Sequence, residues 1–466
     1  MYNFGLVGLG VMGQNFILNV ADNGYTVCGL DLDQQKVDDL INLGGNQQRI
    51  TATTEAKKFV DALEVPRKIM LLVPAGKIVD AAIESLLPYL DQGDIIIDGG
   101  NSFFTNTDTR EEYLKSKGIN FFGAGVSGGA KGARRGPSIM PGGNKEAYQH
   151  IKPIFEAASA KFKGEPCVAY LGPKSAGNYV KMVHNGIEYG LMQLISEIYD
   201  LLKKSCDLSN KELSELYGKW NQGRLQSFLV EITSEIFSQK DALGDGDLID
   251  KILDKAKQKG TGKWTSQNAM DLGIPVPSID VAVTMREISA LKSTRLEADK
   301  IYDKPEIPEV DRNEVIRQAE EALYFSFIVT YAQGLHQLVE ASKTYGYELN
   351  MSVVAKIWRA GCIIRAELLD DISQTFEEHK GLENILIAPA FVEKIKSTVA
   401  SARALVSFGA TSAIPLPGLT SSLTYFDAFT SSRLPLNLIQ AQRDHFGSHT
   451  YERLDREGTF HTEWGE

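Results

Sequence analysis

The chain has 466 residues and a formal net charge of −11 at pH 7. A chain of this length is too long for one compact core, so we expect at least two domains. An apolar content of 43% and a charged content of 23% are typical of a globular protein. The acidic balance argues against a nucleic-acid partner, although a local cluster of arginine and lysine could still bind a small anion.

Cysteine usage and the start of the chain indicate the compartment. The four cysteines are far apart and form no CxxC pair, which predicts reduced thiols rather than a disulfide or zinc framework. The sequence contains no basic leader with a cleavage site and no apolar run near 18 residues. We therefore expect a cytoplasmic protein with no membrane partner.

Residues 1 to about 175 alternate short apolar runs with helical patterns, and each run is followed by Gly, Pro, Asp or Asn. Buried strands that alternate with helices predict a parallel, doubly wound sheet. The expected strands are Phe4–Val7, Val27–Leu30, Ile69–Val73, Ile95–Ile97 and Phe121–Phe122.

The character changes near Gly177, after which nearly everything to about residue 430 reads as helix. Apolar residues from Val180 to Ile198 keep a spacing of three and four over some five turns. Long helical patterns continue at 213–236, 317–343, 351–376 and 392–407. A faint repeat relates residues 190–195 to residues 334–339, at an offset of 144. It predicts a duplicated helical unit.

The predicted architecture is therefore α/β plus all-α. A Rossmann-like, doubly wound dinucleotide-binding domain spans 1–176, a large duplicated helical domain spans 177–433, and a polar tail spans 434–466. We expect no convincing helix from Gly447 onward.

A glycine motif follows the first strand directly. Gly8 would make the turn, Gly10 would let the backbone approach a pyrophosphate, and Gly13 would let helix and strand pack. The helix N-terminus offers free N–H groups to phosphates. Asp31 closes the second strand about twenty residues later, as this type of site requires. The alternative is a glycine-rich turn that binds nothing.

A polar row lies on the strongly periodic helix. Lys181 and Asn185, and likewise His184 and Glu188, are four residues apart, so all four share one face. Lys181 and Glu188 are seven residues apart, or about 10 Å along the helix axis. Their side chains could reach adjacent carbons of one bound sugar. The alternative is an ordinary solvated face, since surface pairs are common.

Three observations favour a functional face. A histidine and an asparagine sit between the charged residues. Gly186 and Gly190 lie in mid-helix, where glycine is destabilising. In addition, the second copy of the repeat has apolar residues at the matching positions, so the scaffold does not need polar ones. These matching residues are Phe325, Ile328, Val329 and Ala332.

Other polar motifs are weaker. The run from Gln258 to Trp264 (QKGTGKW) resembles a phosphate loop but lacks the Walker A spacing, so it could bind an anion or be a plain turn. Arg286 and Arg443 cannot be assigned from spacing alone. His445 and His449 are four residues apart in a glycine-containing segment. No metal-ligand cluster stands out, so we expect no metal.

Taken together, the motifs resemble the 6-phosphogluconate dehydrogenase family, and they span nearly the whole chain in the expected order. The residues that carry the resemblance are 8–15 (GLGVMGQN), 95–102 (IIIDGGNS), 125–129 (GVSGG), 136–143 (GPSIMPGG), 181–190, 259–264 and 440–451.

The resemblance implies the activity and the role of each residue. The expected reaction is oxidative decarboxylation of 6-phospho-D-gluconate to D-ribulose 5-phosphate and CO2, with reduction of NAD or NADP, in the pentose phosphate pathway. Lys181 corresponds to the general base, and Glu188 to the acid that protonates the product. The implied substrate-binding residues are Asn101, Ser127, Gly128, Gly129, His184, Asn185, Tyr189, Lys259, Arg286, Arg443 and His449. The implied cofactor-binding residues are Gly8, Leu9, Gly10, Val11, Met12, Gly13, Asp31, Leu32, Asp33, Val73, Pro74, Ala75 and Asn101.

The resemblance also implies a homodimer, in which Arg443 and His449 complete the partner subunit's active site. The chain departs from the family at one point. NADP-dependent members have Asn-Arg-Thr after the second strand, where this chain has Asp31, Leu32 and Asp33. We therefore expect NAD to be preferred.

Two other functions stay open from the sequence. One is another β-hydroxyacid dehydrogenase acting on a smaller, unphosphorylated acid, although such enzymes are shorter and lack the second helical copy. The other is a dinucleotide-binding regulator without turnover, against which the Lys181 and Glu188 pair argues.

Overall fold

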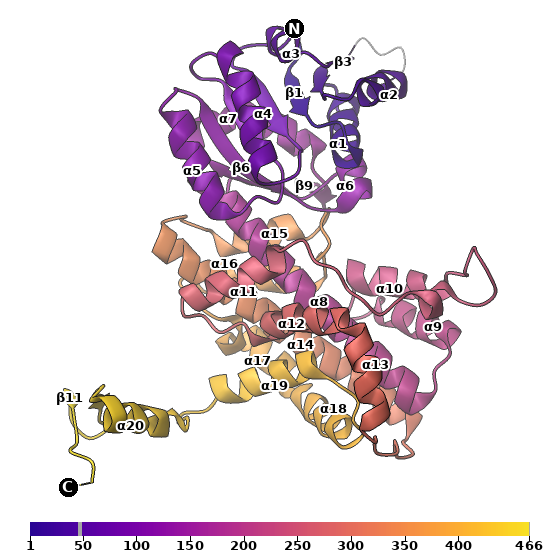
Figure 1. The fold of residues 1–466 in the computed structure, drawn as a ribbon, viewed down its shortest axis with the longest axis vertical. Helices are drawn as coiled ribbons and strands as arrows, with labels where there is room; N and C mark the ends of the chain where they lie inside the picture. The colour runs from indigo at the N-terminus through magenta and orange to yellow at the C-terminus, as the bar shows by residue number, and fades with distance from the viewer. Residues whose placement is uncertain (45–48, 466) are drawn as a thin grey trace.

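A computed structural model describes residues 1–44 and 49–465. Its N-terminal part is a seven-stranded sheet in the order β3-β2-β1-β4-β5-β6-β7 (Figure 1). The first six strands are parallel, and β7 pairs antiparallel with β6. This is the order of a Rossmann sheet with an added edge strand. The strands are β1 (Phe4–Val7), β2 (Val27–Leu30), β3 (Ile50–Thr53), β4 (Lys68–Leu71), β5 (Ile95–Asp98), β6 (Asn120–Val126) and β7 (Ile139–Gly143).

Helices cover both faces of the sheet, and each face has its own buried core. One core joins the sheet to α1, α2, α6 and α7, and the other joins it to α3, α4 and α5. A short hairpin of two-residue strands, β8 (Lys161–Phe162) and β9 (Glu165–Pro166), follows α7. The helices are α1 (Val11–Asp22), α2 (Gln34–Gly44), α3 (Ala56–Asp61), α4 (Lys77–Leu86), α5 (Phe104–Lys115), α6 (Gly129–Arg135) and α7 (Lys145–Ala158), with a 3₁₀ turn, η1, at Leu87–Tyr89.

The predicted doubly wound sheet is confirmed, with two differences. Strand β3 was not predicted because its four residues alternate Ile and Ala with Thr and have no continuous apolar run. Strand β7 lies in the Gly- and Pro-rich run at 136–143, which has the composition of a loop. It forms a strand because β6 supplies an antiparallel partner along five residues.

The second part is helical, as predicted. Three of the long periodic segments are broken into separate helices by short turns, so the predicted runs 213–236, 351–376 and 392–407 were too long. Its elements are α8 (Ala176–Cys206), α9 (Asn210–Trp220), α10 (Phe228–Ser238), η2 (Leu248–Lys251), α11 (Thr261–Asp271), α12 (Pro277–Ala290), α13 (Lys292–Ile301), α14 (Arg312–Tyr345), α15 (Met351–Trp358), α16 (Leu368–Glu378), η3 (Ile385–Ile387), α17 (Pro389–Lys396), α18 (Val399–Thr411) and α19 (Pro417–Phe429).

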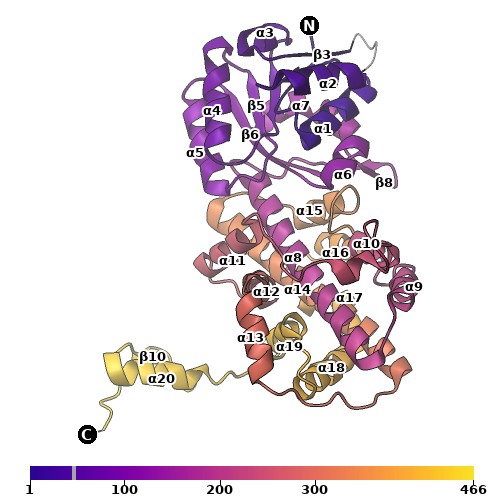
Figure 2. The same ribbon diagram turned by 45° about the vertical axis from the view of Figure 1, so that its right-hand side comes forward.

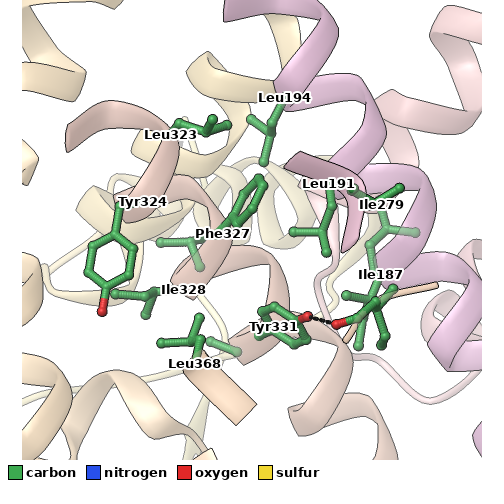
Figure 3. Packing of buried hydrophobic residues seen from close by; sticks show 14 of the residues in the cluster. Ile187, Leu191, Leu194, Ile279, Leu323, Tyr324, Phe327, Ile328, Tyr331 and Leu368 are labelled. Atoms are coloured by element: carbon green, nitrogen blue, oxygen red, sulfur yellow. Dashed lines mark hydrogen bonds between the residues drawn. The ribbon is translucent and has the colours of Figure 1, made fainter. Parts of the chain in front are cut away.

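The two repeat helices, α8 and α14, cross in the middle of this domain and form its main core (Figure 3). Ile187, Leu191 and Leu194 of α8 lie opposite Phe327 and Tyr331 of α14 in that view. Burying large apolar side chains from both helices is the main force that holds the domain together.

Glycines allow this close crossing. A Cβ on Gly190 would lie 2.7 Å from Thr330 Cγ2, and one on Gly334 would lie 2.5 Å from Ile187 Cγ1. Gly186 likewise faces Thr265 of α11, at 2.5 Å from its Cγ2. The interpretation of Gly186 and Gly190 as marks of a functional face was therefore wrong, because both are explained by packing.

The repeat extends beyond the two long helices. The segment Ile274-Pro275-Val276-Pro277 leads into α12, and Ile414-Pro415-Leu416-Pro417 leads into α19, each with its last proline as the first helical residue. Helices α12 and α19 pack together, and the hydroxyl oxygens of Ser278 and Ser422 lie 2.9 Å apart between them. Each copy thus contains a long helix followed later by a proline-capped one.

The tail stands away from the rest of the molecule in both ribbon views (Figures 1 and 2). It contains helix α20 (Leu436–Gly447) and a hairpin, β10 (Tyr451–Glu452) with β11 (Thr459–Phe460). Beyond Gly447 the described residues form no helix, as expected. Among the described residues, no helix is both long and apolar enough to cross a membrane.

Candidate functional site

The glycine motif has the geometry that a dinucleotide site needs. Gly8 has φ of +94°, and a Cβ there would lie 2.6 Å from the Leu72 carbonyl oxygen. A Cβ on Gly13 would overlap the Gly8 carbonyl, so only glycine lets α1 pack on β1. A Cβ on Gly10 would meet no other atom within 4 Å, so the backbone there faces open space. This is the position at which a pyrophosphate can approach the backbone and the start of α1.

Asp31 lies at the end of β2 and contacts this loop. Its Oδ2 accepts a hydrogen bond from the Leu9 N–H at 2.7 Å. Its Oδ1 accepts from the Asp33 N–H at 3.0 Å and lies 3.5 Å from Lys36 Nζ. The neighbouring side chain, Leu32, is 93% exposed and covers nothing. The Asp31 carboxylate therefore ties the end of β2 to the glycine loop, and the Asp33 carboxylate lies 3.9 Å from Lys36 Nζ.

Two further loops lie at the carboxyl ends of parallel strands, where doubly wound folds bind ligands. Val73, Pro74 and Ala75 follow β4, and Asn101 follows β5. Pro74, Ala75 and Asn101 are exposed at this edge of the sheet.

Helix α8 begins inside the first domain, and this places its polar row at the junction of the two domains. A Cβ on Gly177 would overlap carbonyl oxygens of Gly123 and Met140, in β6 and β7. A Cβ on Gly125 would overlap the side chain of Lys181. Because these residues are glycines, the first turns of α8 pack directly against the edge of the sheet.

Lys181 and Glu188 are brought together through His184. The Lys181 Nζ lies 3.4 Å from His184 Nδ1, and Glu188 Oε2 lies 3.9 Å from the same nitrogen. Lys181 and His184 are buried, whereas the Glu188 side chain keeps 21% of its surface exposed. The predicted row is therefore one contiguous group rather than a solvated face.

Burial shifts the proton affinity of all three groups. Desolvation lowers the pKa of Lys181, although the Glu188 charge partly offsets this effect. Desolvation raises the pKa of Glu188, against the opposing charges of Lys181 and Arg286. Desolvation and then the Lys181 charge hold the pKa of His184 well below its usual range, so the imidazole is neutral. A base that is easily neutral and an acid that readily keeps its proton thus share one site.

The other polar residues of the row connect to both domains. Ser127 follows β6, and its Oγ lies 3.3 Å from His184 Nε2. Asn185 Oδ1 lies 3.0 Å from His184 Nδ1, and Asn185 Nδ2 donates to Thr261 Oγ1 at 3.1 Å. The described structure thus brings Ser127, His184, Asn185 and the first residue of α11 into one network.

Arg286 and Lys259, two of the expected substrate-binding residues, lie at the far end of the row. The Arg286 guanidinium carbon sits 3.4 Å from the centre of the Tyr189 ring, a cation–π contact. Arg286 also donates to the Lys257 carbonyl oxygen at 3.2 Å. Lys259 is exposed in the loop next to them, and Gly262 lies directly against Tyr189. A partly buried arginine and an exposed lysine, next to the partly exposed Glu188 and the buried Lys181, form a cationic end to the site.

Arg443 and His449 are not near this site within the chain. Both are exposed and belong to the projecting tail (Figure 2), where Arg443 donates to Gln440 at 3.0 Å. Gly128 and Gly129, in contrast, follow Ser127 at the start of α6.

Three residues of the network were not predicted. Thr261 lies in the run at 258–264, of which only Lys259 was selected. The Trp358 ring meets the His184 ring edge to face at 5.5 Å between centroids. Cys362 is fully buried near Lys181, and burial raises the pKa of its thiol to about 12. Spacing along α8 could not find Trp358 or Cys362, because both lie over 170 residues away and meet the helix only through folding.

In the described part of the chain, no three His, Cys, Asp or Glu residues are grouped so that they could hold a metal ion. A Rossmann domain with an open glycine loop, joined to a buried lysine and a protonatable carboxylate, defines an oxidoreductase that acts on a CH–OH group with a nicotinamide cofactor.

Comparisons with known proteins agree with this class. Residues 3–172 match the model of the NAD binding domain of 6-phosphogluconate dehydrogenase, and residues 177–464 match that of the 6-phosphogluconate dehydrogenase C-terminal domain. The chain belongs to the 6-phosphogluconate dehydrogenase family, which confirms the resemblance. It is 51% identical to the decarboxylating 6-phosphogluconate dehydrogenase of Lactococcus lactis IL1403, over 99% of this chain and 98% of that one.

Two further relatives bear on the cofactor. A Bacillus subtilis relative, 48% identical over 99% of this chain and 98% of its own, is named as NADP⁺-dependent. A solved structure of the Plasmodium falciparum 6-phosphogluconate dehydrogenase superposes with a TM-score of 0.96 at 43% identity, covering 99% of this chain and all of that one. That enzyme is described in complex with its cofactor NADP⁺ and with its substrate 6-phosphogluconate.

Proposed function

We propose that this chain oxidises and decarboxylates 6-phospho-D-gluconate to D-ribulose 5-phosphate and CO2, with reduction of a nicotinamide cofactor. The observation that carries the proposal is the row Lys181–His184–Glu188 at the junction of the Rossmann and helical domains, with Lys181 and His184 buried and Glu188 partly exposed. The family relatives are named for this reaction.

In the first step, Lys181 accepts the proton of the C3 hydroxyl. Its lowered pKa makes the neutral amine, which is the form that acts as a base, easier to reach. The bound nicotinamide supplies the hydride acceptor at C3. His184, neutral and held between Ser127 and Asn185, can orient the sugar without adding a second positive charge beside the lysine.

In the second step, CO2 leaves C2 of the sugar acid and the bonding electrons flow into the C3 carbonyl. Protonated Lys181 stabilises the oxygen that becomes negative and returns its proton there. The enol then gains a proton at C1 of the product, for which Glu188 is the proposed donor. Its raised pKa favours the protonated form that this role needs. One lysine thus serves both steps, with no metal required.

The direct test measures the absorbance of the reduced nicotinamide while 6-phosphogluconate is supplied with each cofactor, together with the release of CO2. The expected result is one CO2 for each reduced cofactor. Turnover only with a small unphosphorylated hydroxy acid would identify another β-hydroxyacid dehydrogenase. Cofactor binding without turnover on either acid would identify a regulator.

We also propose that the protein is a homodimer in which Arg443 and His449 bind the sugar phosphate in the partner subunit's site. The tail carries four apolar residues that are half or more exposed: Leu436, Leu438, Ile439 and Phe446. A groove of about 1460 Å³ runs from Tyr189 and Arg286 to the turn before α19, and it could receive such a tail. A chain ending at Gln442 should have a much higher KM for 6-phosphogluconate, and an unchanged KM would refute the shared site.

Finally, we propose that NAD is preferred over NADP, although two relatives are described with NADP⁺. The carboxylates of Asp31 and Asp33 would repel a 2′-phosphate, and Leu32 offers no guanidinium to bind it. A difference of about one to three orders of magnitude in kcat/KM is expected. The double substitution Asp31→Asn with Leu32→Arg should shift the preference toward NADP, because asparagine keeps the acceptor for the Leu9 N–H. A higher kcat/KM with NADP in the unmodified enzyme would overturn the proposal, and Lys36 would then be the phosphate ligand to test.

A further inference from the structure

A buried arginine joins two loops of the cofactor site. Arg110 lies on α5 with only 6% of its side chain exposed. Its Nη2 donates to the Gly76 carbonyl oxygen at 3.0 Å, and its Nε donates to Asp80 at 2.7 Å. Both acceptors lie where the loop after β4 turns into α4. Arg110 therefore holds the end of the loop that carries Val73, Pro74 and Ala75.

The same guanidinium reaches the neighbouring loop. Its Nη1 lies 3.4 Å from Asp98 Oδ2 and 3.3 Å from Ser102 Oγ. Asp98 is buried at the end of β5, where it also accepts from the Ser102 hydroxyl at 2.5 Å and from the Gly100 N–H at 3.0 Å. These bonds close the turn 98–102, in which Asn101 is the exposed residue.

A second buried side chain ties this turn to the catalytic helix. Asn178, one turn before Lys181 on α8, donates to the Gly100 carbonyl oxygen at 3.3 Å. Its Oδ1 accepts from the Thr107 hydroxyl of α5 at 3.0 Å. The Asn101 turn is therefore clamped from both sides, by Arg110 in the first domain and by Asn178 next to the base.

We propose that Arg110 is a positioning residue that sets the distance between the two cofactor loops, 73–76 and 98–102, and so aligns the cofactor with the sugar carbon beside Lys181. Replacing a buried ion pair by apolar residues is often neutral or stabilising, so stability alone gives little reason to place an arginine here. Its planar fork can bond the Gly76 carbonyl, Asp80 and Asp98 at fixed angles, whereas a lysine carries a single donor group. The proposal rests on the function proposed above.

The test compares Arg110→Lys with the same substitution at Arg67, another largely buried arginine that pairs with an aspartate at the opposite end of the same strands. Arg67 precedes β4 and contacts Asp94, just before β5, at 2.7 Å, with 11% of its side chain exposed. Arg67→Lys should leave the affinity for the reduced cofactor and the kinetic constants within about twofold. Arg110→Lys should weaken binding of the reduced cofactor, measured by its fluorescence, by about tenfold.

Kinetic measurements complete the test. With 6-phosphogluconate deuterated at C3, Arg110→Lys should show a larger isotope effect than the unmodified enzyme, because hydride transfer from a misaligned pair becomes slower. The KM for 6-phosphogluconate should change much less than that for the cofactor. Cofactor affinity and isotope effect equal to those of Arg67→Lys would overturn the proposal, whatever happens to the unfolding temperature.

Two controls keep the result interpretable. If Arg110→Lys does not fold, Asp80→Asn removes the charged acceptor on α4 and leaves Asp98 paired, and at least a threefold loss of cofactor affinity is expected. An unchanged affinity in that variant would equally overturn the proposal. Cofactor binding needs no substrate, so an enzyme inactive on 6-phosphogluconate would contradict the proposed function while the binding data still decide the role of Arg110.

Discussion

Helices α8 and α14 are two copies of one structural unit that differ in what they bury. Both are long, cross at glycines and are followed by a proline-capped helix. Where α8 has Lys181, α14 has Phe325, which packs edge to face on Phe426 at 5.5 Å between ring centroids. Position for position, α14 continues the core, whereas α8 places a polar row next to the Rossmann sheet.

The difference teaches that the polar row is not needed to hold the helices together. The α14 copy shows that apolar residues satisfy the same scaffold, and burying polar groups costs free energy unless each one is bonded. The α8 copy offsets this cost with bonds to Ser127, Asn185 and Thr261. Such a bonded polar row in one copy alone is what a catalytic function predicts.

The largest effect is expected from making α8 resemble α14. Lys181→Met should lower kcat by about 10²–10⁴-fold or more, because one group serves both as the base and as the group that stabilises the oxyanion. The free energy of unfolding should not fall, since a buried amine is replaced by an apolar chain. Steady-state kinetics and urea unfolding measure the two quantities. Lys181→Arg, which keeps the charge but cannot act as a base near neutral pH, should be nearly as inactive, and more than a tenth of the activity in either variant would contradict the role of Lys181.

The reverse change should damage stability rather than chemistry. Phe325→Lys removes a fully buried ring and buries an amine without a partner, so the free energy of unfolding should fall by more than about 3 kcal/mol. Phe325→Leu is the matched control, with an expected loss of about 1–2 kcal/mol and kcat within a few fold. If Phe325→Lys were as stable as Phe325→Leu, position 325 would not be the core position that the comparison assumes.

A third prediction concerns the acid. The raised pKa of Glu188 means that its proton is lost as pH rises through that value, so activity should fall on the alkaline side. Lys181 acts as a base only when it is neutral, and its lowered pKa brings this form within reach as pH rises. On the acid limb, activity should therefore rise with increasing pH. The expected kcat/KM profile is a bell whose limbs belong to the coupled pair. Glu188→Gln should lower kcat by about 10²-fold and remove the alkaline limb. If Glu188→Gln exchanged hydrogen at C1 of the product as fast as the unmodified enzyme does, another group would have to donate the proton.

The smallest effect tests the symmetry of the crossing. Gly190→Ala and Gly334→Ala should each lower the free energy of unfolding by about 1–3 kcal/mol, because each Cβ would press on the opposite helix. Gly132→Ala in α6, whose Cβ would find its nearest neighbour at 3.5 Å, should be neutral or stabilising by up to about 1 kcal/mol. If only one of the two glycine substitutions lowered the free energy of unfolding, the two helices would not contribute equally to the packing at their crossing.

Local patterns were enough to predict much of this molecule. The motif Gly8–Gly13 and the strands around it follow from backbone sterics and apolar runs within a few residues. The row Lys181–His184–Glu188 follows from helical periodicity, which places residues three and four apart on one face. Breaks such as residues 359–367 between α15 and α16 were missed, because apolar periodicity continues across the turn.

By itself, the sequence determined the two-part architecture, the dinucleotide loop and the candidate base and acid, since each depends on contacts between residues close in the chain. Only the tertiary structure decided that Lys181 and His184 are buried, that Thr261 and Trp358 complete the row, and that Gly186 and Gly190 are packing residues. It also decided that Arg110 spans two cofactor loops. Each of these depends on segments tens to hundreds of residues apart, and the proton affinities of Lys181 and Glu188 shift only because folding removes water from around them.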